Sequence, residues 1–486
     1  MAVVTYEAFG AAGDGVTDDL PAICEAHAYA NTHDLPVRSN PEATYHLGRR
    51  ALTAIIETAT DWGTSRFIID DSQGVENHKL ALFEVRSRLP PEPLVIDRLV
   101  RGQDHLEVRP ARDCLVWVEN KHRKIFIRRG LNQNNGTDQK EVFILRQDGS
   151  IEGAIDWDYD EVTRVVAQPI DPDPLVVRGG LFINIANRMR QEVGYNYWSR
   201  NIQISRSNTE IDGVTQQVVG ETDIGHPYQG FLNVQRCANI TLRNCSIDAR
   251  KTYQTIGSAG KPVSMGTYGY LASYVVNFRM LGCGMNDILD RTRWGVIATN
   301  FMKNILVEDC VLSRMDVHMG ASGDYILRRS TLGYIGLNAI GRGRLVIEDS
   351  TLHSENLVSF RQDYGSTWEG EVLIRNTRWI PPANRGGSPV MFRLNNDGLH
   401  DFGYPCFMPE VIRIEGLYVD DSMRSKDPTG IAFFNDPIGP PRSARPFPYR
   451  LTERIEVSHL TSARGLPFRV SDSAELAEAV EVISVP

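Results

Sequence analysis

An aspartate and a histidine two residues apart offer the clearest chemistry in this sequence. Asp316 and His318 stand on either side of Val317 in a segment where apolar and polar residues alternate. Residues i and i+2 of a β-strand share one face, so the carboxylate can orient the imidazole and favour its charged form. The pattern predicts a proton-transfer pair on the outward face of a strand, with Val317 directed inward.

Polar residues in the segments that follow continue this face. Counting from the small residue that ends each preceding strand places Asn338 level with His318, and one inserted residue moves the next equivalents to Ser359 and Arg361. Arg361 would then lie two turns of chain from His318, about 10 Å between backbones, which long side chains and one sugar ring can bridge. The face continues with the candidate substrate-binding residues Arg393 and Asn395.

Ionisable and aromatic residues in the neighbouring loops extend the candidate site. Aromatic rings stack on the apolar C–H faces of sugars, so a Trp or Tyr beside a charged group suits a carbohydrate. The candidate catalytic residues from these loops are Asp287, Asp290, Asp363 and Tyr364. The candidate substrate-binding residues are Lys251, Tyr253, Lys261, Arg291, Arg293 and Trp294. No cofactor is required by this pattern; if calcium binds, its expected ligands are Asp287, Asp290 and Asp363.

The elements that must position these residues form a repeat that starts at about residue 200. Each unit reads apolar, any residue, apolar, any residue, polar or glycine, then a small residue. The small residues are Ser207, Cys245, Cys283, Cys310, Ser330, Ser350 and Thr377, spaced 38, 38, 27, 20, 20 and 27 positions apart. Strands that recur every twenty-odd residues without intervening helices predict a parallel β-solenoid, in which outward residues of successive turns line up as ladders. The small residues from Cys245 to Thr377 would form an interior column, although adjacent turns are close enough for a disulfide.

The N-terminus carries a second signal. The segment from Tyr6 to Asp19 reads YEAFGAAGDGVTDD, and the helical segment after it begins Leu20-Pro21. This opening resembles the signature of the pectate-lyase-like right-handed parallel β-helix superfamily, whose members include polysaccharide lyases, glycoside hydrolases, C5-epimerases and phage tailspikes. The resemblance implies that the helix covers the first coil, with Asp18 or Asp19 as its cap. A dinucleotide loop is the competing interpretation, but the glycine order is G-x-x-G-x-G and no βαβ pattern follows.

The Asp–His pair carries a further resemblance. Asp316-Val317-His318 is similar to the Asp-Pro-His element of alginate C5-epimerases, which also precedes an apolar-x-apolar strand. Val317 replaces the proline, and Arg314 and Met315 stand where a tyrosine is expected. The resemblance implies only that Asp316 and His318 form a proton-transfer pair.

The chain is expected to be an all-β solenoid in four parts. Residues 1–60 hold the signature, capping helix and first coil; residues 61–175 hold further first coils and an antiparallel β excursion; residues 176–465 form the main parallel β-helix; and residues 466–486 cap the last coil. The excursion is predicted from consecutive strand patterns and a hairpin turn at 147–149, and it serves either a binding partner or structural elaboration.

The amino-acid composition limits the kinds of partner that the protein is expected to bind. Hydrophobic residues make up 42% and charged residues 23% of the chain, which excludes disordered or fibrous classes. The net charge of −9 argues against nucleic acid, and no apolar run approaches a membrane span. Seven cysteines at no zinc-like spacing indicate neither a disulfide framework nor a metal site.

No signal peptide is visible, so the protein is expected to be cytoplasmic, phage-associated, or secreted with its leader removed. The expected partner is a polysaccharide or oligosaccharide, with a homo-oligomer possible.

Two mechanisms and one binding role follow from these residues. In β-elimination from a uronic acid, Arg361 or Arg393 would neutralise the sugar carboxylate, and His318 or a Lys or Arg would take the C5 proton. Tyr364 or Tyr253 would protonate the leaving oxygen. In glycoside hydrolysis, Asp287 or Asp290 would act with Asp316 or Asp363. The cationic face favours the lyase, and a non-catalytic tailspike-like glycan-binding protein is the remaining alternative.

Overall fold

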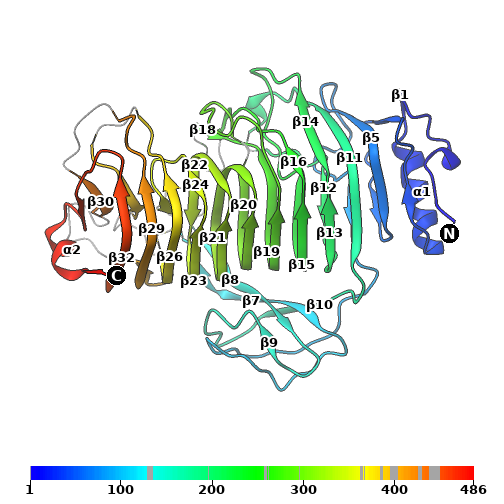
Figure 1. Cartoon of the computed structure of the whole chain (residues 1–486). Coiled ribbons are helices and arrows are strands. Elements are labelled where there is room, and N and C mark those ends of the chain that lie inside the picture. Colours follow the sequence, from blue (N-terminus) through cyan, green and yellow to red (C-terminus); the bar gives the residue numbers. More distant parts are fainter. Residues whose placement is uncertain are drawn as a thin grey trace.

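The computed structural model describes residues 2–127, 135–194, 196–256, 260, 262–294, 296–361, 365, 367–383, 387–394, 403–424, 430–436 and 449–486. Most strands belong to one long parallel sheet that coils from the N-terminal to the C-terminal end of an elongated solenoid (Figure 1). The fold class expected from the repeat, a right-handed parallel β-helix, is confirmed. Among the described residues, no helix has the length and apolar character needed to cross a membrane.

The first coils lie beneath the N-terminal helix. Their strands are β1 (Asp14–Asp18), β2 (Val37–Arg38), β3 (Thr44–Leu47), β4 (Ala54–Ile56), β5 (Thr60–Asp70) and β6 (Phe83–Val85). Helix α1 (Leu20–His33), preceded by the 3₁₀ turn η1 (Glu7–Phe9), covers their open end (Figure 1). Asp18 Oδ1 accepts a hydrogen bond from the Leu20 amide at 3.1 Å, whereas Asp19 Oδ1 accepts one from the Ala12 amide at 2.6 Å. The two aspartates thus have different roles. Asp18 accepts a hydrogen bond from the first helical N–H, and Asp19 holds the glycine-rich loop.

The main solenoid follows with parallel strand pairing throughout. Its strands are β11 (Leu175–Ile185), β12 (Ile202–Ile204), β13 (Thr209–Asp212), β14 (Thr215–Val219), β15 (Leu232–Arg243), β16 (Ser246–Ile247), β19 (Tyr268–Leu281), β20 (Val296–Glu308), β21 (Val311–Arg328), β22 (Thr331–Ala339), β23 (Gly341–Glu348), β24 (Thr351–Leu352), β25 (Val358–Phe360), β26 (Trp368–Trp379), β27 (Val390–Arg393), β29 (Val411–Val419), β30 (Ile431–Phe434), β32 (Arg454–Ser462) and β33 (Phe468–Arg469). Short pairs add β17 (Tyr253–Ile256) with β18 (Pro262–Met265) and β28 (Cys406–Phe407) with β31 (Tyr449–Arg450), and η2 (Gln191–Val193) is a single turn.

A left-handed backbone position explains the polar-or-glycine element of the repeat. From the second unit of the repeat onward, the residues at this position have positive φ angles between 44° and 65°, and they are Asn244, Gly282, Asp309, Arg329, Asp349 and Asn376. Glycine and short polar side chains tolerate this conformation best, and it turns the chain sharply at the same place in each coil.

The small residues after that turn form a continuous buried column. Cys283 N lies 3.3 Å from Cys310 Sγ, Cys310 N donates to Ser330 Oγ at 3.0 Å, and Ser330 N donates to Ser350 Oγ at 3.1 Å. All seven cysteines of the chain are free thiols. The interior-column interpretation is confirmed, and the disulfide alternative is wrong because each thiol contacts backbone of the adjacent coil instead.

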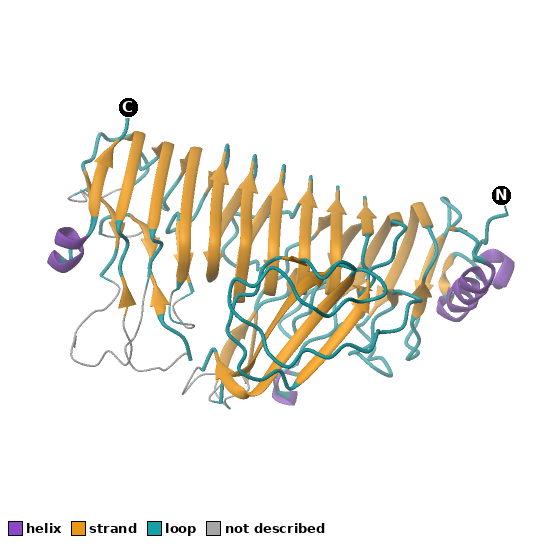
Figure 2. Cartoon of the chain, turned by 90° about the horizontal axis from the view of Figure 1, so that it is seen from below, coloured by secondary structure: helices purple, strands orange, loops and turns teal. Residues whose placement is uncertain are grey.

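The excursion is a separate antiparallel sheet. Its strands are β7 (Cys114–Ile125), β8 (Thr137–Leu145), β9 (Ile151–Glu152) and β10 (Arg164–Pro169). Strand β7 is interrupted by a bulge between Asn120 and Lys124, where its register with β8 shifts. Strand β5 pairs directly with β11, so the whole excursion is inserted between two adjacent coils. Figures 1 and 2 show it lying across the middle of the solenoid, where Leu115 and Val142 pack with Val276 of β19.

The C-terminal end is also covered. Helix α2 (Ala474–Ala479) buries Leu476 fully, and β34 (Glu481–Ser484) pairs in parallel with β32. The segment expected to cap the last coil therefore forms both a short helix and a strand, which satisfies the sheet end that would otherwise pair with other chains.

Candidate functional site

Strand β21 positions the central residues by simple alternation. Met315 and Val317 are fully buried in the solenoid core, so Arg314, Asp316 and His318 lie on the opposite face of the strand. The inward direction expected for Val317 is confirmed. A strand anchored by core residues on both sides of Asp316 holds these three side chains in a fixed arrangement.

Three nitrogen donors surround the Asp316 carboxylate. Arg314 Nη2 lies 2.8 Å from Oδ1, and His318 Nε2 lies 2.7 Å from Oδ2. Arg361, which follows β25, reaches back so that its Nη1 lies 2.8 Å from both oxygens. The Asp316 side chain is completely buried, whereas those of Arg314, Arg361 and His318 keep 9%, 15% and 18% of their surface exposed. The carboxylate thus lies at the bottom of the cluster, and only the side chains of Arg314, His318 and Arg361 reach the surface.

The electrostatics keep Asp316 ionised. Burial alone would raise the pKa of its carboxyl, but the charges of Arg314 and Arg361 and the contact with His318 together hold that pKa well below its ordinary value. An ionised carboxylate is only an acceptor of hydrogen bonds, so His318 Nε2 must carry the proton in this contact. The second ring nitrogen, Nδ1, then presents its lone pair.

The Asp316 carboxylate orients the imidazole and favours its charged form, as expected, but other causes outweigh this effect on the pKa of His318. Burial lowers the pKa of the imidazole, and the Arg361 guanidinium lowers it further, although Asp316 raises it. The sequence suggested that the carboxylate would favour the charged imidazole, but it showed neither the extent of burial nor the second cation. His318 is therefore neutral at neutral pH and can accept a proton at Nδ1.

Aromatic side chains border the cluster. The ring of Tyr268 on β19 meets His318 edge-on, with centroids 5.9 Å apart, and Tyr197 stacks on Tyr268 at 5.6 Å. On the other side, the Arg314 guanidinium lies 5.1 Å from the ring centroid of Trp294. Trp294 was expected to face substrate; here it packs against the cationic part of the cluster.

The cluster has unpaired donors. Arg314 Nε, Asn338 Nδ2 and Trp294 Nε1 are buried and have no hydrogen-bond partner within the described part of the chain. Buried polar groups normally find partners, so this concentration at one place indicates that a ligand or ordered water completes them. All three groups donate, and the missing partner must therefore be an acceptor.

The register differs from the expected alignment. Asn338 lies opposite Asp316, not His318, because the pairing of β21 with β22 shifts between Leu312 and Arg314. Ser359 of β25 lies opposite Asn338. On the next coil Arg393 lies opposite Ser359. Arg393 is therefore three coils from Asp316, about 14 Å at the usual strand spacing, and its side chain is exposed.

The loop residues are mostly paired among themselves. Lys251 Nζ lies 2.9 Å from Asp223, and Arg293 Nη1 lies 2.6 Å from Glu221. Tyr253 is 2% exposed, and burial raises its pKa to about 12. These residues form a rim whose charges are already neutralised.

The remaining candidates divide into exposed and undescribed residues. The Arg291 guanidinium lies 5.9 Å from the Tyr334 ring centroid. Asp287 and Asp290 are exposed, and within the described residues neither contacts Asp316 or His318. The sequence-predicted residues outside the described ranges are Lys261, Asp363, Tyr364 and Asn395. In the described part of the chain, no three His, Cys, Asp or Glu side chains gather closely enough to hold a metal ion.

Sequence reasoning missed three residues of the cluster. Arg314 stands two positions before Asp316, so the alternation that linked Asp316 to His318 also predicts its place on that face. Tyr268 and Tyr197 come from earlier coils, and only the pairing of β19 with β20 and of β20 with β21 brings Tyr268 to His318. No local pattern marks that approach.

Comparisons with known proteins agree with the fold. The tailspike gp49 of Pseudomonas phage LKA1 superposes with a TM-score of 0.52 at 13% identity, covering 99% of this chain and 84% of that one. The tailspike gp61 of Pseudomonas phage phi297 gives 0.54 at 13% identity, covering 99% and 83%. These likenesses and the signature define the class: the chain has the fold of the pectate-lyase-like parallel β-helix superfamily.

One curated protein is similar in sequence over a short stretch. A capsule KL64-specific depolymerase of Klebsiella phage P510 is 29% identical over 142 residues, which is 24% of this chain and 13% of the depolymerase. The chain therefore matches only a small part of that protein's length. No protein-family model matches the chain.

Proposed function

We propose that this protein cleaves glycosidic bonds of a uronic-acid-containing polysaccharide by β-elimination. The observation that carries the proposal is the His318–Asp316–Arg361 cluster: a neutral, oriented imidazole beside a cationic group on rigid strands. The fold shared with tailspikes, together with the local similarity to a phage protein described as a capsule depolymerase, supports a polysaccharide as substrate.

His318 has the properties of a general base. Its Nε2–H donates to Asp316, which fixes the tautomer and leaves Nδ1 free to accept a proton. The lowered pKa keeps this nitrogen unprotonated at neutral pH. Such a base would take the proton from C5 of the uronic acid, a step that positioned side chains accelerate by about 10²–10⁴-fold.

The charge of the cluster suits a carboxylate. Arg314 and Arg361 carry two positive charges, Asp316 carries one negative charge and His318 is neutral, so one positive charge remains. A sugar carboxylate bound there would neutralise that charge and lower the barrier to removing the adjacent proton. Its oxygens are also the acceptors that the unpaired donors lack.

Tyr268 is suited to protonate the leaving oxygen. It borders His318, whereas Tyr253, a candidate from the sequence, is buried in the rim. As His318 takes the C5 proton, the C5–H electrons form the C4–C5 double bond, the C4–O bond breaks, and the leaving oxygen receives the phenolic proton. The proton that His318 accepts and the proton that Tyr268 donates thus balance the elimination.

The carboxylates proposed for hydrolysis are less suitable. Asp316 is ionised and bound by three donors, so it can neither donate a proton nor attack readily. Asp287 and Asp290 are exposed, which leaves them without the apolar surroundings that raise the pKa of a catalytic acid.

Digestion of a panel of uronic-acid polysaccharides, bacterial capsules included, tests the proposal. We expect oligosaccharide products one water lighter than hydrolysis products, together with the ultraviolet absorbance of a conjugated double bond. His318→Ala should lower turnover about 10²–10⁴-fold, while His122→Ala, at an exposed position on the inserted sheet, should not. Products with the mass of hydrolysis, or full activity in His318→Ala, would exclude this mechanism. Binding without any cleavage would favour the glycan-binding alternative.

A further inference from the structure

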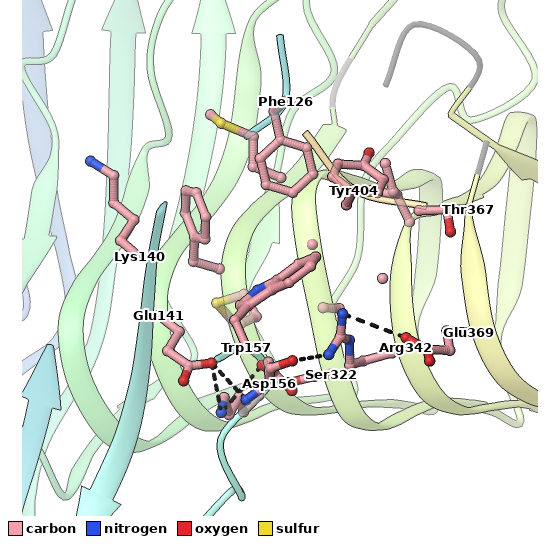
Figure 3. Close-up of a pocket in the computed structure, with 18 of the residues that line it drawn as sticks. Phe126, Lys140, Glu141, Asp156, Trp157, Ser322, Arg342, Thr367, Glu369 and Tyr404 are labelled. Carbon is pink, nitrogen blue, oxygen red and sulfur yellow. Dashed lines mark hydrogen bonds and ion pairs between the residues drawn. The ribbon is translucent and has the colours of Figure 1, made fainter. Parts of the chain in front are cut away.

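A second hollow lies where the inserted sheet meets the solenoid. It encloses about 100 Å³ between Phe126, residues of β8 and the 156–157 loop on one side and residues of β20, β21 and β23 on the other. Figure 3 shows aromatic side chains gathered on one side of this seam pocket and charged side chains on the other, with Trp157 between them. Because two separately formed sheets build the walls, the pocket exists only in the assembled fold.

The aromatic side is a connected set of rings. Tyr404 lies 5.3 Å from Phe126 and 5.9 Å from Trp157, measured between ring centroids. Phe126 in turn meets Phe301 of β20 at 5.9 Å. Rings arranged in this way offer apolar surface to a small hydrocarbon group, such as a methyl group or the face of a sugar.

The charged side is internally neutralised. Lys303 Nζ is bound by Asp156 at 3.2 Å and by the Gly153 carbonyl at 2.7 Å. Arg342 stacks on Trp157, with its guanidinium 4.2 Å from the ring centroid, and lies 3.5 Å from Glu369. Each of these cations already has a carboxylate partner. This arrangement does not attract a second ion and suits a neutral ligand.

Glu141 supplies a buried oxygen, Oε1, without a hydrogen-bond partner among the described residues, whereas its Oε2 also lies 3.7 Å from Lys303 Nζ. Only 3% of this residue is exposed, its Oε2 accepts the Asp156 amide at 2.8 Å, and its Oε1 is buried without a hydrogen-bond partner in the described residues. Burial raises the pKa of Glu141 to about 8 despite the nearby Lys303. The carboxyl is therefore largely protonated at neutral pH, and a protonated carboxyl is a hydrogen-bond donor.

An open groove leads to the pocket. It shares Arg101, Asp156, Arg342 and Glu369 with the pocket walls and holds about 490 Å³. A sugar ring can lie in the groove while one substituent enters the narrower slot. Met319, which directly follows His318 in sequence, also lines the pocket and contacts Thr137 of the inserted sheet, with Oγ1 3.6 Å from its sulfur. One residue of the pocket wall is thus the sequence neighbour of His318 on β21.

We propose that the seam pocket is a binding subsite for one acylamino sugar of the same polysaccharide, with the acyl methyl among the aromatic rings and the amide at Glu141. An amide fits because it carries both an N–H and a carbonyl, and so can pair with Glu141 Oε1, which has no hydrogen-bond partner among the described residues. A deoxy-sugar methyl would fill the apolar side but leave Glu141 unsatisfied, which is costly in a buried site. The inference rests on the proposed polysaccharide substrate and identifies one of its components.

The proposal includes a pH dependence. Glu141 faces Lys303, Asp156, Arg342 and Tyr159, of which Lys303 and Arg342 favour its ionised form and Asp156 opposes it. The donor exists below the pKa of about 8 and is lost as pH rises through it. Binding of an acylamino sugar should weaken over that range, and Glu141→Gln, whose amide donates at every pH, should abolish the dependence.

Saturation-transfer NMR with monosaccharides tests the subsite without any cleavage reaction. The probes are the methyl glycosides of N-acetylglucosamine and N-acetylgalactosamine, with those of glucose and galactose as controls, at about pH 6 and about pH 9.5. We expect transfer centred on the acetyl methyl at the lower pH, loss of that signal at the higher pH, and background transfer to glucose and galactose. Glu141→Gln should keep the signal at both pH values, and Trp157→Ala and Glu141→Leu should lose it.

His318→Ala separates this inference from the proposed reaction. That variant should retain the acetyl signal, because the imidazole does not line the seam pocket. If both N-acetyl probes gave only background transfer, or if Trp157→Ala and Glu141→Leu bound them as well as the parent protein, the subsite would be refuted even where the protein cleaves uronic acid glycans. Equal transfer to glucose would refute its specificity for an acylamino group.

Discussion

Two sets of stacked charges on this solenoid use the same residue types to opposite effect. One is a charge ladder at a single register position of β20, β21, β23, β26 and β29, made of Glu308, Arg328, Glu348, Arg375 and Glu415. The other is the cluster around Asp316. In the ladder the signs alternate, so Arg328 lies between Glu308 at 3.2 Å and Glu348 at 2.9 Å. In the cluster, two arginines and a histidine share one buried carboxylate.

The difference shows how stacking can either neutralise charge or concentrate it. The coil spacing of about 4.8 Å places side chains of successive turns within ion-pairing distance, so alternating signs satisfy each other in a solvated row. Around Asp316 the signs do not alternate, a net positive charge remains, and three donors lack partners. The charges of the ladder are satisfied within it, whereas we propose that an anionic ligand completes the cluster.

Asp316→Asn should produce the largest effect. The substitution would remove the carboxylate that Arg314 and Arg361 share in a largely buried cluster, and breaking a buried ion pair typically costs about 3–5 kcal/mol of folding free energy. It would also release the His318 ring from its orientation. Chemical unfolding of Asp316→Asn beside Glu348→Gln measures the contrast. The ladder variant should lose no more than about 1 kcal/mol, because exposed pairs contribute little. Equal losses of unfolding free energy in the two variants would contradict the distinction between the buried cluster and the solvated ladder.

Arg361→Ala should give an intermediate effect. Loss of a charge-assisted hydrogen bond of about 1.5–3 kcal/mol predicts that kcat/KM on a uronic acid glycan falls roughly tenfold to hundredfold. Arg328→Ala, the matched removal of a ladder arginine, should leave kcat/KM unchanged. Added salt should weaken substrate binding by the parent protein more than by Arg361→Ala. Identical kinetics of the two arginine variants would contradict the assignment of the carboxylate to the cluster.

The pH profile should show the smallest effect. His318 acts as a base only when neutral, and its pKa lies below the ordinary value of 6.5, so kcat/KM should stay constant down to about pH 6.5 and fall only under more acidic conditions. In Arg361→Ala one cause of the lowered pKa is gone, and the acidic limb should move to higher pH. An acidic limb above pH 7 in the parent protein would show that the imidazole is charged in the resting state.

The repeat and the signature were sufficient to predict the fold, because both depend on local chemistry. Alternation about Val317, the left-handed corner before each small residue and the glycine-rich opening are properties of short segments, and each coil contacts only its neighbours. The proximity of Asp316 to His318 belongs to the same group, since two residues on one face of one strand lie near each other in any fold that keeps the strand.

Only the tertiary structure decided what surrounds that pair. Loop lengths differ between coils, so counting residues placed Asn338 level with His318, whereas the shifted pairing places it opposite Asp316. The approach of Tyr268 and Arg361 depends on register across several coils, and the seam pocket depends on how a separate sheet packs on the solenoid. The sequence by itself thus determined the scaffold and the pairing of Asp316 with His318, while burial, protonation and the rest of the site followed from contacts between segments far apart in the chain. A pKa depends on every charge and on the solvent within reach, and neither is encoded in local spacing.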